Sequence, residues 1–267
     1  MLEMLRQLCT LAQLHGQLLP HEIPQRPGWC VAVHYSAGLW PGGCYYDFLP
    51  LADGRVLLLI ADAGNQGAAS TALALMVRVV LHSCLFGSDI HRAPCSPVPA
   101  WSNEPPHFLL GHLNRVLAEN KLEEQFMTAF CGVLDPVDGS CHFANAGHPH
   151  PRWWRALPRT VEAVRDVVGP PLSTDRRASY QQRVIGIEPG DLLVLYSDSL
   201  VAALNESGQR FGWERLDSAL REAAPQGAEA VKSAVLARFE NFLAGKGYSN
   251  EVTFVVIERQ KENRVHS

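Results

Sequence analysis

Two aspartates, Asp62 and Asp198, have the sequence setting that most strongly indicates chemistry. Each ends a strongly apolar stretch, "RVLLLIAD" and "DLLVLYSD", and each is followed by a turn. A carboxylate at the end of a buried strand is costly to remove from water unless it is paired or binds a cation. The alternative for either residue is an aspartate that caps the following turn or helix. Two such positions, together with the glycine pair Gly42-Gly43, favour one shared cation site.

Cys44 directly follows that glycine pair, in "PGGCYYDFLP", so a turn delivers a strand whose first side chain is a thiol. A thiolate beside a histidine can attack a phosphoryl group. Cysteine-dependent phosphatases, however, cradle phosphate in a tight loop that ends in arginine, and "CYYDFLPL" has no such loop. The sequence therefore favours a small buried apolar side chain at this position over a nucleophile.

The elements that must position these residues are mostly strands. Apolar and alternating runs predict strands at residues 29–37, 44–52, 55–62, 126–135, 140–147, 150–156, 180–187, 191–198 and 251–259. Asp53-Gly54 and Asp138-Gly139 are hairpin signals between neighbouring strands. Helices are expected at residues 68–86, 107–120, 213–223 and 227–244. Strands followed by two helices, twice over, with a closing strand, predict an α+β fold of two antiparallel sheets packed face to face with helices outside.

Residues 1–19 form an additional expected element. Leucines recur there at three- and four-residue spacing, which predicts an amphipathic helix with a narrow apolar stripe. The stripe either packs on the domain or serves as a dimer seam or a signalling helix. The predicted organisation is this helix, one domain at residues 20–260 and a polar tail at residues 261–267, with a Pro/Ser-rich loop at residues 92–106 inside the domain.

Composition narrows the class of protein. The 267 residues are 47% hydrophobic and 19% charged, which is ordinary for a globular protein long enough to bury a large core. The net charge of -4 comes without a basic stripe, which argues against nucleic acid as a partner. Seven scattered cysteines without C-x-x-C spacing argue against a disulfide framework or a zinc knuckle and indicate a cytoplasmic protein. Arg78 and His82 interrupt the most apolar run, residues 68–86, so a buried helix is expected there, not a membrane span.

The order of motifs resembles a known family. "PGGCYYDF", "LLLIADAGNQGAASTALAL", "FMTAFCGVLDPVDGSCHFANAGHPHP", "IEPGDLLVLYSDSL", "FGWERL" and "NEVTFVVIER" are similar to successive blocks of the PPM-type metal-dependent serine/threonine protein phosphatases, in their SpoIIE/RsbU-like branch. The similarity covers about residues 19–259. It implies a four-layer αββα sandwich for residues 20–260, with a two-metal centre of manganese or magnesium at one edge of the sheets. Two such cations lower the pKa of a bridging water and neutralise charge on the phosphoryl group.

The resemblance also implies roles for particular residues. Asp62 matches the aspartate that bridges both metals, beside the backbone carbonyl of Ala63, and Asp198 matches a ligand of one metal. Cys44 and Asn250 stand where the family normally has aspartate. Asn250 retains a carbonyl oxygen, whereas a cysteine sulfur suits zinc better than manganese or magnesium. Two carboxylates in place of four leave about two positive charges of a metal pair uncompensated, which weakens metal binding.

Neighbouring residues could replace the two aspartates that the metal site lacks. Asp47 and Glu251 are carboxylates close in sequence to the altered positions, but in a regular strand they point to the opposite face, so a bulge is needed to turn either inward. His148, in "NAGHPHP", lies in a turn that the family places near the active edge. It is interpreted as a structural or supporting residue, with direct binding of metal or phosphate as the alternative.

Two functions follow from the resemblance. One is a phosphatase with a degenerate metal site that acts on a phosphorylated regulatory protein, such as an anti-sigma-factor antagonist with a STAS-type fold. The other is a pseudophosphatase that keeps the fold and binds a regulatory partner without hydrolysis. Further departures, Ser199, Ala203 and the pair Asn65-Gln66, accompany the loss of the two aspartates.

Overall fold

The computed structural model describes residues 2–20, 22–39, 42–86, 104–120 and 125–261. The Pro/Ser-rich loop predicted at residues 92–106 and the tail at residues 261–267 fall largely outside the described residues. The helices are α1 (Leu2–Leu18), α2 (Ala68–Phe86), α3 (Pro106–Glu119), α4 (Asp198–Ala202), α5 (Gly212–Ala223), the 3-10 turn η3 (Ala224–Gln226) and α6 (Ala228–Leu243). The strands are β1 (Trp29–Ser36), β2 (Tyr45–Pro50), β3 (Val56–Ala63), β4 (Met127–Leu134), β5 (Ser140–Ala146), β6 (Arg152–Arg155), β7 (Thr160–Ala163), β8 (Arg183–Gly186), β9 (Leu192–Tyr196) and β10 (Val252–Arg259).

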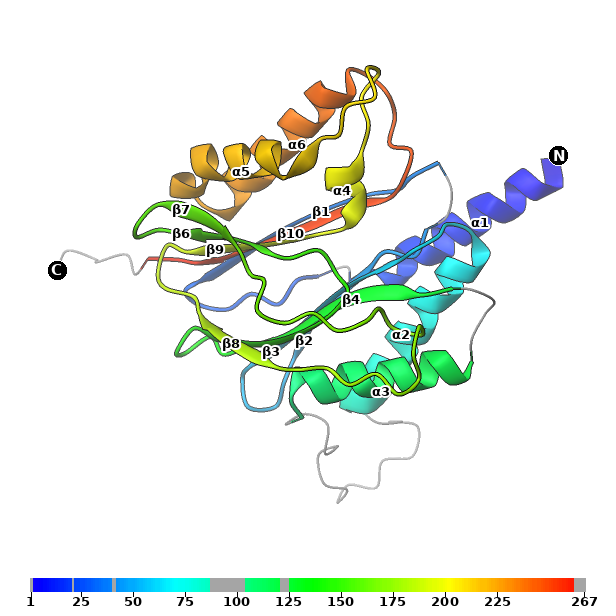
Figure 1. The fold of residues 1–267 in the computed structure, drawn as a ribbon, viewed down its shortest axis with the longest axis horizontal. Helices are drawn as coiled ribbons and strands as arrows, with labels where there is room; N and C mark the ends of the chain where they lie inside the picture. Colours follow the sequence, from blue (N-terminus) through cyan, green and yellow to red (C-terminus); the bar gives the residue numbers. More distant parts are fainter. Residues whose placement is uncertain (1, 21, 40–41, 87–103, 121–124, 262–267) are drawn as a thin grey trace.

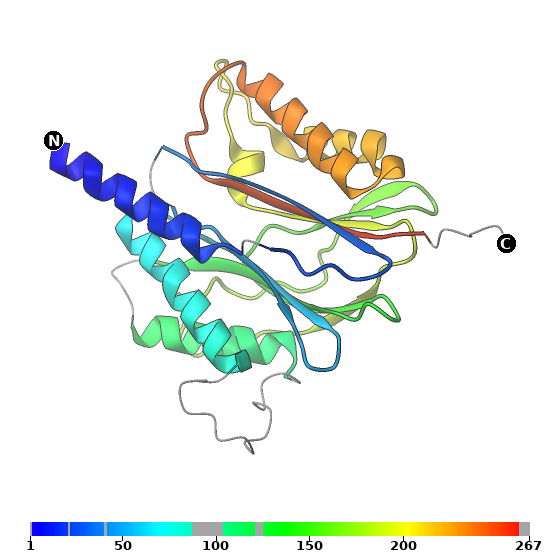
Figure 2. The same cartoon turned by 180° about the vertical axis from the view of Figure 1, so that it is seen from behind.

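The strands form two five-stranded antiparallel sheets. The β10 sheet has the order β1-β10-β9-β6-β7, and the β3 sheet has the order β2-β3-β4-β5-β8. Helices α5 and α6 lie over the outer face of the β10 sheet, while α2 and α3 cover the β3 sheet, as Figures 1 and 2 show from opposite sides. This confirms the expected α+β fold, a four-layer αββα sandwich.

The core explains why the central strands read as continuous apolar runs. In β10, Val255 and Ile257 face the other sheet, whereas Phe254 and Val256 face α5 and α6. Alternate side chains point to opposite faces of a strand, so a strand covered on both faces must be apolar at every position. Strands β3 and β9 follow the same rule.

Most predicted elements are present within one or two residues of their expected bounds. The hairpin between β2 and β3 turns at Asp53-Gly54, where Gly54 has φ +90° and Asp53 accepts the backbone N–H of Arg55. Three elements were not predicted: β7, α4 and the 3-10 turn η3, which lies between the helices expected at residues 213–223 and 227–244. β7 is a four-residue edge strand, too short to show a periodicity, and it forms by pairing with β6. α4 begins at Asp198, where the sequence indicated only a turn.

The N-terminal segment forms the expected helix. α1 packs against α2, and its N-terminal end points away from the rest of the molecule (Figure 1). Of the helices in the described residues, α2 is the one long and apolar enough to cross a membrane, by length and composition alone; 44% of its window Ala68–Leu85 is buried. Core helices pass the same test.

Candidate functional site

The fold brings four strand ends to one edge of the sandwich. β2 and β3 are antiparallel, with Tyr45 opposite Ala61, so the start of β2 lies beside the end of β3. β10 and β9 are likewise antiparallel, with Phe254 opposite Tyr196, so the start of β10 lies beside the end of β9. Residues that are far apart in the sequence therefore meet at this edge.

A cavity of about 1210 Å³ opens between these strand ends. Its lining contains the residues that the sequence and the resemblance singled out, with the exceptions of Asp47 and Ala203. They are Cys44, Asp62, Ala63, His148, Asp198, Asn250 and Glu251, and Gly42 and Gly43 lie among them. The structure thus places both aspartates and both altered positions around one space.

The glycine pair is required by close packing at this edge. A Cβ on Gly42 would lie 2.2 Å from Oε2 of Glu251, and one on Gly43 would lie 2.5 Å from Cβ of Ala63. Neither position has room for a side chain. The turn is also tied to α2, because the Thr71 hydroxyl donates to the carbonyl of Gly42 over 2.9 Å.

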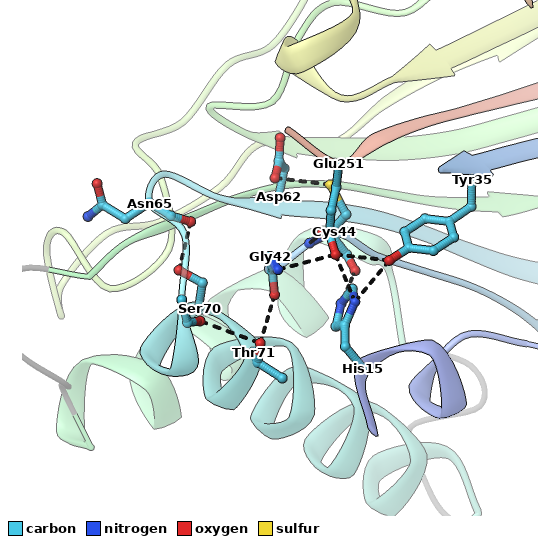
Figure 3. Close-up of polar contacts among 10 residues, drawn as sticks. His15, Tyr35, Gly42, Cys44, Asp62, Asn65, Ser70, Thr71 and Glu251 are labelled. Carbon is cyan, nitrogen blue, oxygen red and sulfur yellow. Dashed lines mark hydrogen bonds and ion pairs between the residues drawn. The ribbon is translucent and has the colours of Figure 1, made fainter. Parts of the chain in front are cut away.

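Cys44 contacts the central aspartate directly. Its Sγ lies 3.2 Å from Oδ1 of Asp62 and donates a hydrogen bond to it (Figure 3). Burial, reinforced by the charges of Asp62 and Glu251, raises the pKa of the Cys44 thiol well above its usual value. Without a cation beside it, the group is therefore a neutral thiol and not the thiolate that a nucleophile needs.

Asp62 and Asp198 face the cavity without a cationic partner. Within the described residues neither forms an ion pair, and the charge of Asp198 adds to that of Glu251 in disfavouring ionisation of Asp62. Burial is the largest cause, and the pKa of Asp62 rises to about 7 although the Cys44 thiol opposes the shift. A buried carboxylate in this state is stabilised by any cation that reaches it.

Asn250 is engaged with another altered position. Its side-chain oxygen accepts a hydrogen bond from Nε2 of Gln66, which lies in the turn after β3. An oxygen used in this way has less freedom to contact a cation. Two departures from the family pattern, 184 residues apart, are therefore joined by an amide-to-amide hydrogen bond.

Glu251 is buried and holds the glycine turn in place (Figure 3). Its carboxylate accepts the backbone N–H groups of Gly42 over 3.2 Å and Cys44 over 3.0 Å, and the hydroxyl of Tyr35 over 2.9 Å. Nδ1 of His15 lies 3.0 Å from the same carboxylate. Burial alone raises the pKa of Glu251, but these partners, led by His15, outweigh it and lower the pKa overall.

His15 is the residue at this edge that the sequence did not reveal. It projects from α1, is 1% exposed, and its Nε2 lies 2.7 Å from the carbonyl oxygen of Cys44. A carbonyl oxygen can only accept a hydrogen bond, so Nε2 of His15 is the donor. The other ring nitrogen, Nδ1, lies beside the carboxylate of Glu251 and the hydroxyl oxygen of Tyr35. The Tyr35 hydroxyl donates its own proton to Glu251. Both ring nitrogens therefore contact oxygen atoms of residues far away in the sequence.

The structure turns Glu251 toward the cavity and leaves Asp47 away from it. Glu251 precedes the first residue of β10, so the alternation of a regular strand does not apply and no bulge is needed. Asp47 lies inside β2, on the α2 side, where it accepts from the Tyr45 hydroxyl over 2.6 Å and contacts Nε2 of His82 at 2.7 Å. Asp47 therefore supplies no carboxylate to the cavity.

His148 is a buried residue held by its neighbours. Its backbone N–H donates to the side chain of Asn145 over 2.7 Å, and its Nδ1 lies 3.0 Å from the hydroxyl of Thr128. Thr128 in turn contacts the carbonyl of Asp62 at 3.2 Å. Burial lowers the pKa of His148 to about 3, with the backbone carbonyl of Tyr196 opposing the shift. A neutral imidazole offers no charge to a phosphate, so its contacts support a structural position behind Asp62.

The side-chain groups that line the cavity determine which kind of metal centre it can hold. Within the described residues, no group of three or more His, Cys, Asp or Glu side chains has an arrangement that could hold a metal ion. The residues fit a two-cation centre poorly, because a thiol at Cys44 and a neutral amide at Asn250 leave the cations with fewer anionic ligands, and both side chains are hydrogen-bonded to neighbours. Asp62 and Asp198 line the same cavity and form no ion pair within the described residues, so these two carboxylates would be the ones to hold a hard cation there.

The chain is similar in sequence to one protein family and to two characterised proteins. A family model described as "Stage II sporulation protein E (SpoIIE)" matches residues 52–260. The chain is 23% identical over 197 residues to the phosphoserine phosphatase RsbU of Bacillus subtilis, which covers 74% of this chain and 54% of that protein. It is 22% identical over 217 residues to Protein IcfG of Synechocystis sp., covering 76% of this chain and 34% of that protein. The chain thus spans about half and about a third of the length of these two relatives.

Two solved structures share the fold. The SiaA-PP2C domain of Pseudomonas aeruginosa superposes with a TM-score of 0.74 at 16% identity, and the match covers 96% of both chains. The RsbU and RsbW domains of Rv1364c from Mycobacterium tuberculosis superpose with a TM-score of 0.71 at 21% identity, covering 91% of this chain and 63% of that one. At these identities the similarity shows the fold.

Proposed function

Because the chain belongs to the SpoIIE family of PPM-type phosphatases, we propose that it is a metal-dependent serine/threonine phosphoprotein phosphatase with a metal site reduced to Asp62 and Asp198. The observation that carries the proposal is the pair of unpaired carboxylates in one large cavity at the ends of β3 and β9. A manganese or magnesium ion held there supplies a Lewis acid and lowers the pKa of a bound water.

The chain's own residues support the reaction in separate ways. Asp62 and Asp198 would hold the cation, and the Thr128 hydroxyl fixes the backbone of Asp62 by donating to its carbonyl. Glu251 keeps the glycine turn open beside the cavity through the N–H groups of Gly42 and Cys44. A cavity of about 1210 Å³ exceeds the space that a phosphoserine side chain needs, which supports a protein as substrate.

The partner is proposed as a phosphorylated regulatory protein in the cytoplasm. The similarity to RsbU, described as a phosphoserine phosphatase, and to a protein that joins RsbU and RsbW domains supports this class of substrate. A STAS-type antagonist of an anti-sigma factor is the specific candidate. We also propose that the chain consists of an N-terminal helix at residues 1–19, one domain at residues 20–260 and a tail at residues 261–267. Helix α1 can contribute to a dimer. Helix α2 is a core helix and not a membrane span, since its Arg78 and His82 are directed toward Asp47.

The test is release of phosphate from a phosphoserine peptide in the presence of manganese. Asp62→Asn and Asp198→Asn are each expected to abolish turnover, because each removes half of the anionic charge that holds the cation. Asp166→Asn, a change at an exposed aspartate outside the cavity, is the matched control. Full activity in either cavity variant contradicts the proposed site.

A pseudophosphatase is the second candidate, favoured by one set of contacts. Cys44 and Asn250 do not merely lack carboxylates; their side chains are committed to Asp62 and Gln66. Calorimetric titration with manganese separates the two functions. A measurable site supports the phosphatase, and a flat titration supports the pseudophosphatase. Under either outcome, Cys44→Asp combined with Asn250→Asp is expected to strengthen manganese binding by at least about tenfold, because it restores two anionic ligands.

A further inference from the structure

A second cavity adjoins the first at the edge of the sandwich. It has a volume of about 530 Å³ and shares Ser199, Ala202 and Asn250 with the main cavity. We call it the side chamber and define it by the residues that only it contains: Ala203, Leu204, Phe239, Leu243, Lys246, Gly247, Tyr248, Ser249 and Val252. A volume of this order is typical of sites that receive a ligand group.

The walls of the side chamber are well-defined segments of backbone. On one side, the loop after α4 is closed by the N–H of Phe211, which donates to the carbonyl of Ala203 over 2.9 Å, and by a bridge between Leu204 and Arg210. On the other side, α6 ends at Ala244 in a left-handed conformation, which turns the chain toward β10. The chamber therefore forms between two fixed elements.

The lining of the chamber is apolar with one cation at its rim. Phe239 and Leu243 are buried, while Leu204 is 52% exposed, which is a large fraction for a leucine beside a cavity. Lys246 is exposed and makes no ion pair within the described residues. This chemistry contrasts with that of the main cavity, which Asp62 and Asp198 both line.

We infer that the side chamber receives an apolar side chain of the protein substrate, close in sequence to the phosphorylated residue, with an acidic neighbour at Lys246. The inference rests on the proposed function, because a phosphorylated residue in the main cavity forces the flanking chain out through its rim. The shared residues Ser199, Ala202 and Asn250 make the chamber continuous with that rim. An extended chain covers about 3.3 Å per residue, and the two cavities share lining residues, so we expect the apolar residue within about four positions of the phosphoserine.

The test uses fluorescein-labelled phosphoserine peptides in an alanine and serine background. A single leucine is placed at each position from about four before to about four after the phosphoserine, and binding is measured by fluorescence anisotropy without added metal, so that the peptides are not hydrolysed during the measurement. One leucine position is expected to bind about tenfold more tightly than its alanine counterpart, the effect of filling an apolar pocket. An aspartate next to that leucine is expected to strengthen binding further, and a lysine to weaken it.

Variants tie the preference to the chamber. Leu204→Ser is expected to reduce the leucine preference to less than about threefold, because it removes the exposed apolar wall. Val184→Ser, at a valine that is also 52% exposed but lies in β8, is the matched control and keeps the preference. Lys246→Glu is expected to reverse the aspartate-over-lysine preference, while Arg177→Glu, at another exposed cation without an ion pair in the described residues, retains it.

The outcomes separate the chamber from the phosphatase activity. Absence of any leucine preference in the parent, or an unchanged preference in Leu204→Ser, overturns the chamber. Hydrolysis of p-nitrophenyl phosphate, which is too small to reach the chamber, tests the proposed function by itself. A parent protein that hydrolyses nothing yet prefers one leucine position disproves the phosphatase and supports the chamber.

Discussion

The contact between His15 and Glu251 makes a quantitative prediction about stability. His15→Ala removes one of four donors to a buried carboxylate and also removes the hydrogen bond to the carbonyl of Cys44. A hydrogen bond to a charged group contributes about 1.5 to 3 kcal/mol, and breaking one partner from a buried pair costs about 3 to 5 kcal/mol. Water that fills the space left by the imidazole offsets part of this loss. We expect the free energy of unfolding to fall by about 3 kcal/mol.

Glu251→Gln is expected to cost a similar amount for a different reason. The amide has the size of the carboxylate, but its NH₂ group cannot accept a hydrogen bond. This NH₂ group must therefore face either the backbone N–H of Cys44 or the donors on the other oxygen, and those donors lose their acceptor. The double variant then loses less than the sum of the single variants, by about 1.5 kcal/mol or more, because both changes remove the same interaction.

Urea unfolding followed by circular dichroism at pH 7 measures these free energies, with the slope against denaturant concentration checked for constancy. Gln13→Ala, at an exposed position of α1, is the matched control and is expected to stay within about 0.5 kcal/mol of the parent. Hydrogen exchange adds a local readout, because the N–H groups of Gly42 and Cys44 are expected to lose protection in His15→Ala. A loss below about 0.5 kcal/mol, or strict additivity in the double variant, refutes the role assigned to His15.

Three further predictions concern residues around the cavity. Arg152→Ala breaks the two-point contact with Asp217 that joins β6 to α5 in a mostly buried setting, and should lower the unfolding free energy by about 3 kcal/mol in urea denaturation. The pKa of His148 is about 3 in the folded protein, below its unfolded value near 6.5. The stability that its neutral form contributes is therefore fully present above pH 6.5 and is lost as the pH falls toward 3. His148→Asn should reduce the slope of the unfolding free energy against pH in this window by up to about 1.4 kcal/mol per pH unit. Gly43→Ala should lower the melting temperature, because its Cβ would lie 2.5 Å from that of Ala63, and an unchanged melting temperature contradicts the packing described for the turn.

The predictable part of the fold was set by local patterns. The apolar runs of β3 and β9, the spacing of apolar residues in α3 and α6 and the Asp53-Gly54 turn each act over a few residues, so their signals are readable along the chain. β7 gave no signal, because an exposed four-residue edge strand has neither a periodicity nor an apolar run. α4 was missed for the same reason, since five residues are too few to show a helical period.

The sequence by itself placed Asp62 and Asp198 at the ends of apolar runs, and the resemblance to the phosphatase family marked Cys44 and Asn250 as departures from its motifs. Only the tertiary structure decided what those changes do. It brings the imidazole of His15 to a carboxylate 236 positions away and directs the amide of Gln66 to Asn250. Such contacts depend on which strand ends meet at an edge, a property of sheet pairing over the whole chain that no local spacing encodes.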